Sequence, residues 1–529
     1  MKKIKIDYDL SKEVEKAFYE YERYKDFLET VSFEENEAWY ESWEYFSNLY
    51  LESFFNKTIL INSLKKEYRL EEKSFIVSDF KYNELYFTSS KEEAEEQGHY
   101  IDRRNGIEEF NHTLNRIYSK DYLEEGITHP TRNITFQVTD ECNLRCTYCY
   151  QHNKKSHLMN FETAKALIDK LFNNELKEYL NTDNVLGFIF EFIGGEPLLN
   201  IDLINEITNY FIRKTFIEKK SRYVLFCMFS ICSNGLLHFD PKVQQYLSKH
   251  FKHVSYDITV DGNKELHDKC RLDCNNCGSY DRAISAVNDY RNTFNKIMGS
   301  KITISPDNVL GISDALIDML QHDYRNININ YVYEKGWNNS HATILYYELK
   351  KLTDYLKENN LLNETNFSIL SNTVGQPEDE TRIINWCGGT GLMLAMDYKG
   401  DLYPCLRYME SSVGDSVPPY IIGNIFSNNY DKEKIEILNS ITRQSQSSKE
   451  CLECPISSGC GWCSAYNYEI TGTPNKRVTY ICPMHKARVL SCKYYFNNKN
   501  EEFNLNIPKE WALEIIPEKE YDLLINGET

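Results

Sequence analysis

The chain has 529 residues, a formal net charge of −19 and an isoelectric point near 5.2. A chain of this length exceeds what one hydrophobic core usually supports, so several domains are expected. The negative charge argues against nucleic acid as a partner, and the 41% hydrophobic and 26% charged content excludes wholesale disorder.

The first residues, MKKIKIDYDLSKEVEK, contain no apolar stretch after the lysines, so no secretory signal is expected. The longest apolar runs, VLGFIF and YVLFCMFSIC, are well short of the roughly 18 residues that predict a membrane span. We therefore expect a cytoplasmic protein with no membrane partner. Because disulfides are rare in a reducing cytosol, the sixteen cysteines favour metal or redox chemistry.

Residues 1–130 contain no cysteine and are expected to form a mostly helical region. Ser32 and Glu35 make a capping box, and the aromatic stripe after it is typical of packing between helices, with peptide recognition as the alternative. Residues 73–87, KSFIVSDFKYNELYF, predict a short hairpin. The stripe consists of Trp39, Trp43, Phe46 and Tyr50.

Residues 131–345 alternate short apolar runs with longer amphipathic segments, which predicts βα units around a parallel sheet. Six such units predict an α/β fold with a partial (βα)6 TIM-like barrel, whose ligands collect at the carboxyl ends of the strands. The expected strands are NITFQV, VLGFIFEFIGG, YVLFCMFSICSNG, HVSYDITVDG, KITISPD and NININYVYE.

A helical linker is expected over residues 346–380, and a cysteine-rich domain over 381–495. Residues 392–405, LMLAMDYKGDLYPC, predict two strands around a glycine turn. Between Cys451 and Cys492 the sequence leaves little room for a hydrophobic core, so bound metal is expected to supply much of the stability. The tail, 496–529, carries no motif.

Three cysteines follow the first barrel strand with the spacing Cys142-x3-Cys146-x2-Cys149. Thiolates hold iron-sulfur clusters, and three thiolates on a four-iron cluster leave one iron open for another ligand. The alternative is a zinc knuckle that borrows His152, although structural zinc sites usually use two separated ligand pairs.

The stretch CNLRCTYCY resembles the cysteine loop of the radical S-adenosylmethionine (radical SAM) enzymes. The resemblance implies a four-iron four-sulfur (4Fe-4S) cluster whose open iron binds S-adenosylmethionine, with Tyr148 beside the adenine. The motifs GGEP and CSNG follow the second and third strands, and ITVDGNKELHDKCR closes the fourth with a threonine where the family has serine. The implied contacts to S-adenosylmethionine are Gly194, Gly195, Glu196, Ser233, Thr259 and Arg271.

The C-terminal cysteines resemble the SPASM extension, which implies two auxiliary 4Fe-4S clusters. By this resemblance one is held by Cys451, Cys454, Cys460 and Cys482, and the other by Cys387, Cys405 and Cys463. The second of these sets is one ligand short. Either Cys492 supplies the missing ligand, or one iron stays open and binds a substrate thiolate.

Five further cysteines have no family position. Cys227 and Cys232 lie in an apolar strand and are expected to be small buried hydrophobic side chains. Cys270, Cys274 and Cys277, near His267, repeat the spacing of the opening triplet, and the choice between a third metal site and ordinary thiols stays open.

These resemblances imply a radical SAM/SPASM enzyme that modifies a ribosomally made, cysteine-containing precursor peptide, with thioether crosslinking as the reaction and a flavodoxin- or ferredoxin-type protein as electron donor. The alternatives are carbon-carbon crosslinking or formylglycine formation by the same machinery, RNA modification, and a noncatalytic metal scaffold.

Overall fold

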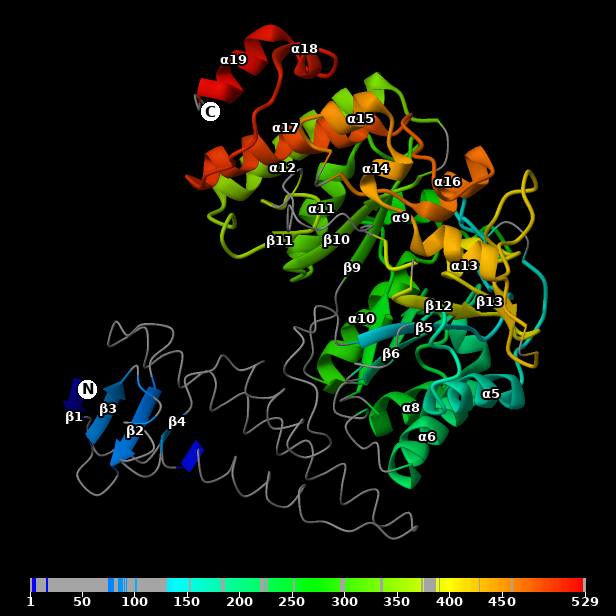
Figure 1. Ribbon diagram of the computed structural model, residues 1–529. Helices are drawn as coiled ribbons and strands as arrows, with labels where there is room; N and C mark the ends of the chain where they lie inside the picture. Colours follow the sequence, from blue (N-terminus) through cyan, green and yellow to red (C-terminus); the bar gives the residue numbers. More distant parts are fainter. Residues whose placement is uncertain are drawn as a thin grey trace. The chain divides into compact units, whose positions relative to one another are not determined.

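The structure is a computed structural model, drawn in Figure 1. It divides into two compact units, Met1–Pro130 with Phe211–Phe226 and Thr131–Tyr210 with Cys227–Thr529. No helix in the described part of the chain is long and apolar enough to span a membrane. The described residues are 2–5, 16–17, 75–79, 84–88, 90, 92, 100–101 and 131–526, without 152–153, 181, 183–184, 186, 219–222, 224–226, 251–252, 295–299, 334–335, 373, 375–386, 390, 428 and 458–459.

The N-terminal unit contains a four-stranded antiparallel sheet with the order β1-β3-β2-β4. The predicted hairpin is confirmed, since Phe75 lies opposite Thr88 in β2 and β3. The predicted capping box and aromatic stripe lie outside the described residues. The strands are β1 (Lys2–Lys5), β2 (Phe75–Asp79), β3 (Glu84–Thr88) and β4 (Tyr100–Ile101).

The second unit contains the six predicted barrel strands, in two parallel sets. Because side chains alternate along a strand, Phe190 and Phe229 stack on one buried face while Glu191 and Ser230 lie on the other, which we call the inner face. The strands are β5 (Thr131–Gln137), β6 (Gly187–Ile193), β7 (Met228–Ser233), β8 (Val254–Ile258), β9 (Ser300–Ile304) and β10 (Asn326–Tyr331).

Within the described residues no strand ladder joins β8 to β9, so the expected barrel wall consists of two sheets. The Asp261 carboxylate accepts the backbone N–H of Thr303 at 3.4 Å, and the Ser300 hydroxyl donates to the Val260 carbonyl at 3.4 Å. Side chains thus form hydrogen bonds with backbone groups that would pair between the strands in a continuous sheet. Instead, β10 pairs in parallel with β9 on one side and with β11 (Asn366–Phe367) on the other, in a three-stranded sheet.

A helix follows each barrel strand, as the alternating pattern predicts. The side chain of Asn160 caps the first of them by accepting the backbone N–H of Thr163. The helix that follows the sixth barrel strand, α12, begins at Asn339, so the expected domain boundary at residue 345 falls inside it. The helices are α5 (Phe161–Phe172), α6 (Ile201–Ile217) after the 3-10 turn η1 (Pro197–Asn200), α8 (Pro241–His250), α9 (Lys264–Cys270), α10 (Tyr280–Phe294), α11 (Ile312–Gln321) and α12 (Asn339–Glu358).

The C-terminal extension continues the main sheet at the edge of β5. β12 (Met393–Met396) pairs in parallel with β5, and β13 (Asp401–Tyr403) and β14 (Gly423–Asn424) follow in antiparallel pairing. The predicted turn is confirmed at Gly400, whose φ of 81° favours glycine. The resulting order is β14-β13-β12-β5-β6-β7-β8.

Helix α17 (Cys482–Lys499) gives the extension a hydrophobic core. It packs against α12, beside which it lies in Figure 1, and buries Ala487, Val489 and Leu490 completely. The expectation of little room for a hydrophobic core between Cys451 and Cys492 was therefore wrong for this helix. The remaining elements are η2 (Leu406–Tyr408), α13 (Lys432–Asn439), α14 (Arg443–Gln446), α15 (Lys449–Glu453), α16 (Ser464–Thr471), α18 (Lys509–Ala512) and α19 (Glu518–Asn526).

Candidate functional site

The cysteine loop, residues 142–149, follows β5 and is fixed by backbone hydrogen bonds to the segment after α9. Arg145 N–H donates to the Leu272 carbonyl at 2.7 Å and Thr147 N–H to the Cys270 carbonyl at 2.9 Å. Burial raises the pKa of Cys142 and of Cys146, and the neighbouring thiols of the loop raise it further. The three predicted thiols therefore lie within electrostatic reach of one another.

Gly194 and Gly195 allow the end of β6 to approach the cysteine loop closely. A Cβ atom on Gly195 would lie 2.3 Å from the Glu141 carbonyl oxygen and 2.6 Å from the Cys142 Cβ, and one on Gly194 would lie 2.7 Å from the Thr139 carbonyl oxygen. No real Cβ occupies such space, so both positions require glycine as the backbones stand.

Glu196 is buried, and its carboxylate links the 3-10 turn η1 to the end of β7. It accepts hydrogen bonds from the Ser233 hydroxyl at 2.8 Å, from Asn234 N–H at 2.8 Å and from Leu198 N–H at 3.1 Å. Burial raises the pKa of Glu196, and these donors oppose that rise by favouring the ionised form. Glu196 and Ser233 thus contact each other, and both side chains are engaged within the protein.

Tyr148 and Arg271 come together with a residue that the sequence analysis did not select, Asp261. Arg271 donates to the Tyr148 hydroxyl at 2.7 Å and lies 3.7 Å from the Asp261 carboxylate, which accepts the Tyr148 hydroxyl. The arginine Nε is buried without a hydrogen-bond partner in the described part of the chain. Asp261 could have been selected from the sequence, because it precedes Gly262 inside the motif ITVDG. The structure shows that this aspartate is buried and that Gly262 has a positive φ.

Thr259 directly follows the last residue of β8, and its hydroxyl lies 3.5 Å from the Cys232 sulfur. Cys232 is exposed, so the expectation of a buried thiol was wrong for it, although it is confirmed for Cys227. The reason is strand alternation: Ile231 and Ser233 point to the buried face of β7, which turns Cys232 to the inner face.

Cys387, Cys405 and Cys463, the first auxiliary set, are brought together from three segments. Burial is the largest cause that raises the pKa of Cys405, and the thiols of Cys387 and Cys463 raise it further. Cys463 caps α16, and the Cys387 sulfur lies 3.7 Å from the Ser464 hydroxyl at the start of that helix.

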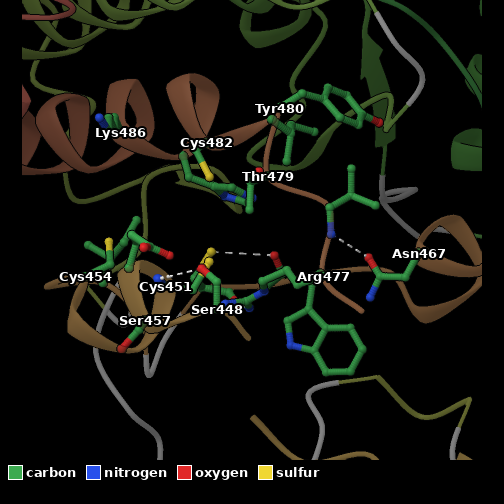
Figure 2. A pocket seen from close by; sticks show the side chains of 18 of the residues that line it. Ser448, Cys451, Cys454, Ser457, Asn467, Arg477, Thr479, Tyr480, Cys482 and Lys486 are labelled. Carbon is green, nitrogen blue, oxygen red and sulfur yellow. Dashed lines mark hydrogen bonds between the residues drawn. The ribbon is translucent and has the colours of Figure 1, made fainter. Parts of the chain in front are cut away.

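The second auxiliary set lines a cavity of about 620 Å³ beside α17. Cys482, the first residue of α17, extends toward α15, which carries Cys451 and is capped by Cys454, as Figure 2 shows. Burial raises the pKa of Cys482 to about 11, and the three other thiols of the set contribute to the rise. The members of the set are Cys451, Cys454, Cys460 and Cys482.

The other candidate ligands lie elsewhere. The Cys492 thiol is buried in α17 and donates to the Ile369 carbonyl at 3.5 Å. Cys270 is buried, whereas Cys274 and Cys277 are exposed. His267, the fourth member considered for a third metal site, accepts the Asp261 N–H at Nδ1 and contacts the Ser279 hydroxyl at Nε2.

The donors fit iron-sulfur clusters by their chemistry, since they are thiols grouped as three, three and four on loops and helix ends. Arg271 lowers the pKa of Cys146 and retains a buried, unpaired Nε at the same place. Among the described residues no three His, Cys, Asp or Glu side chains converge on a single metal ion. His152, the fourth ligand of the alternative zinc knuckle, lies outside those residues.

Residues 129–284 match a family described as "4Fe-4S single cluster domain". The chain is 29% identical over 171 residues to the cysteine-type anaerobic sulfatase-maturating enzyme of Clostridium novyi, which covers 30% of this chain and 40% of that enzyme. It is 23% identical over 339 residues to the antilisterial bacteriocin subtilosin biosynthesis protein AlbA of Bacillus subtilis, which covers 62% of this chain and 66% of AlbA. Each match thus spans less than two thirds of the relative.

The fold is similar to that of a solved structure of histidine-tagged anSMEcpe with bound AdoMet, with a TM-score of 0.54 and 18% identity over 74% of this chain and 99% of the other. At this low sequence identity, the structural similarity shows a shared fold and nothing about activity. The cysteine-loop motif, the parallel sheet with its C-terminal extension, and the two maturation proteins point to the same assignment. The chain is therefore similar in its motifs and in its fold to radical SAM/SPASM maturases.

Proposed function

We propose that the protein is a radical SAM enzyme that forms a thioether crosslink in a ribosomally made, cysteine-containing precursor peptide. The observation that carries the proposal is the grouping of thiols: three in the cysteine loop and three in the first auxiliary set, beside a complete set of four. A three-thiolate site leaves an iron open for another ligand. Two open sites suit a reaction that binds both a cofactor and a substrate sulfur.

The cysteine loop would hold the cluster that binds S-adenosylmethionine. When bound, the pair supplies a 5'-deoxyadenosyl radical that removes hydrogen from a carbon of the peptide. Gly194 and Gly195 allow the strand end to approach this site, and Glu196 fixes the loop after β6 to the end of β7. Arg271 donates to the Tyr148 hydroxyl beside the loop, and the Asp261 carboxylate orients the guanidinium.

The first auxiliary set would bind the peptide's cysteine sulfur. Thiolate sulfur is a soft ligand that suits an iron-sulfur site, and binding removes the thiol proton. A carbon-sulfur bond would form between this sulfur and the carbon that has lost hydrogen, and a cluster held by this set would take up the one electron that is left over. A flavodoxin- or ferredoxin-type protein would deliver the electron that starts the reaction.

Formylglycine formation in a sulfatase is the second candidate, favoured by the similarity to a sulfatase-maturating enzyme. Both reactions remove two hydrogens from the substrate. They differ in the fate of sulfur, because a thioether retains the sulfur and consumes a free thiol, whereas oxidation of cysteine to formylglycine loses the sulfur.

The experiment is coexpression with short cysteine-containing peptides taken from the neighbouring reading frames, followed by mass spectrometry and alkylation of free thiols. We expect the peptide to lose two hydrogens and one alkylatable thiol per crosslink, with all sulfur retained. A Cys142→Ala variant is the control that abolishes the radical step. A modified peptide with an unchanged thiol count, or one that has lost sulfur, would reject thioether formation.

A further inference from the structure

Arg407 and Tyr150 connect the cysteine loop to the first auxiliary set. Tyr150 directly follows Cys149, and Arg407 lies in η2, two residues after Cys405. The guanidinium carbon of Arg407 lies 4.7 Å from the centre of the Tyr150 ring, within the range of a cation–π contact. The pair therefore spans the two groups of thiols that the proposed reaction uses.

The charge of Arg407 acts on the first auxiliary set. Arg407 lies two residues after Cys405, and its guanidinium is close enough to Cys405 and Cys463 to act on both electrostatically. It also lowers the pKa of Tyr150, against burial and the thiols of Cys149 and Cys405. Because a guanidinium does not lose its proton in proteins, this positive charge is present at every working pH.

A three-thiolate site must accept further negative charge in the proposed reaction. The substrate thiolate adds one charge when it binds, and its proton leaves to solvent. One hydrogen atom of the peptide would go to the 5'-deoxyadenosyl radical, and a cluster held by this set would take up the one electron released as the carbon-sulfur bond forms. Each event is costly in a buried site unless a fixed cation lies close by.

We propose that Arg407, held over the first auxiliary set by the ring of Tyr150, is the positioning residue that allows this site to accept the substrate's thiolate and then the electron. The proposal rests on the proposed function, since it requires an iron-sulfur cluster at Cys387, Cys405 and Cys463. Tyr150 orients the guanidinium through its ring face, so the conformation of the cysteine loop and the charge at the auxiliary site are linked.

The test measures reduction potentials in the full chain. Replacing Cys142, Cys146 and Cys149 by alanine removes the first cluster, and reconstitution with iron and sulfide then leaves the two auxiliary signals for a titration followed by electron paramagnetic resonance. We expect Arg407→Gln to move one signal to a more negative potential and to leave the other unchanged. Arg407→Lys, which keeps the charge, should move it less.

Binding of a small thiol gives a second readout. With 2-mercaptoethanol as the probe, the parent protein should show a changed spectrum at a lower thiol concentration than the Arg407→Gln variant. Tyr150→Leu should act in the same direction as Arg407→Gln, since it removes the ring that holds the guanidinium. Lys432→Gln is the matched control, because the Lys432 side chain is 81% exposed on α13 and should shift neither signal.

Unchanged potentials in the Arg407→Gln and Tyr150→Leu variants would overturn the proposal. An equal shift of both signals would overturn it as well, because that result indicates a general disturbance rather than a local charge. If the parent protein shows a single auxiliary signal, the cluster assignment of the proposed function fails, and this proposal fails with it.

Discussion

The buried contact between Asp261 and Arg271 makes a quantitative prediction. Asp261→Asn keeps the shape of the side chain and removes its charge, which leaves the guanidinium buried without a counter-ion. At the observed separation of 3.7 Å, unit charges in an effective dielectric constant of about 20 attract by about 4.5 kcal/mol. Breaking a buried pair by removing one partner typically costs about 3–5 kcal/mol, which agrees with this value.

The assay is amide hydrogen exchange of peptides that cover residues 259–273 in the reconstituted protein. A cost of about 3–5 kcal/mol corresponds to an increase of about 10²- to 5 × 10³-fold in the exchange rate of amides that open with this contact. Asp281→Asn is the control, because its ion pair with Lys264 is exposed and close in sequence, so no change is expected. Exchange in Asp261→Asn within about threefold of the control would refute the reasoning.

Three further outcomes are expected. Gly195→Ala should lose about four irons per chain by displacing the cysteine loop, whereas Gly461→Ala, with open space around its Cβ, should lose none. Cys492→Ser should leave the iron content unchanged while Cys482→Ser lowers it; equal losses would make Cys492 a ligand. Burial lowers the pKa of His250 to about 3. Between pH 6.5 and pH 3 this imidazole is therefore protonated in the unfolded chain but not in the folded one. The free energy of unfolding falls as the pH is lowered through this range, by up to about 1.4 kcal/mol per pH unit. In the His250→Leu variant the urea midpoint of unfolding should depend less steeply on pH than in the parent protein. Identical slopes in the two proteins would contradict the lowered pKa of His250.

Local patterns predicted the elements of this fold better than their pairing. The hairpin at Phe75 and the turn at Gly400 follow from alternation and turn residues close in sequence. The parallel pairing of β12 with β5 joins residues about 260 positions apart, which no local pattern encodes. Between β8 and β9, the side chains of Asp261 and Ser300 take backbone groups from the other segment, which no local pattern encodes either.

The candidate site shows the same division. The spacing of the cysteines predicted which thiols would gather, because ligand spacing is itself a local pattern. The exposure of Cys232 and the contact between Tyr150 and Arg407 depend on how strands and loops distant in sequence face each other. Those features could be found only in three dimensions.

The pairing of β12 with β5 also constrains how this protein can be divided. β5 is the strand that leads into the cysteine loop, and β12 satisfies the hydrogen-bonding groups along one of its edges. A chain shortened at residue 380 would leave that edge unpaired, and unpaired edges are templates for aggregation between molecules. The barrel therefore depends on its extension for solubility as well as for cysteines, and swapping extensions between relatives requires that this strand pairing be preserved.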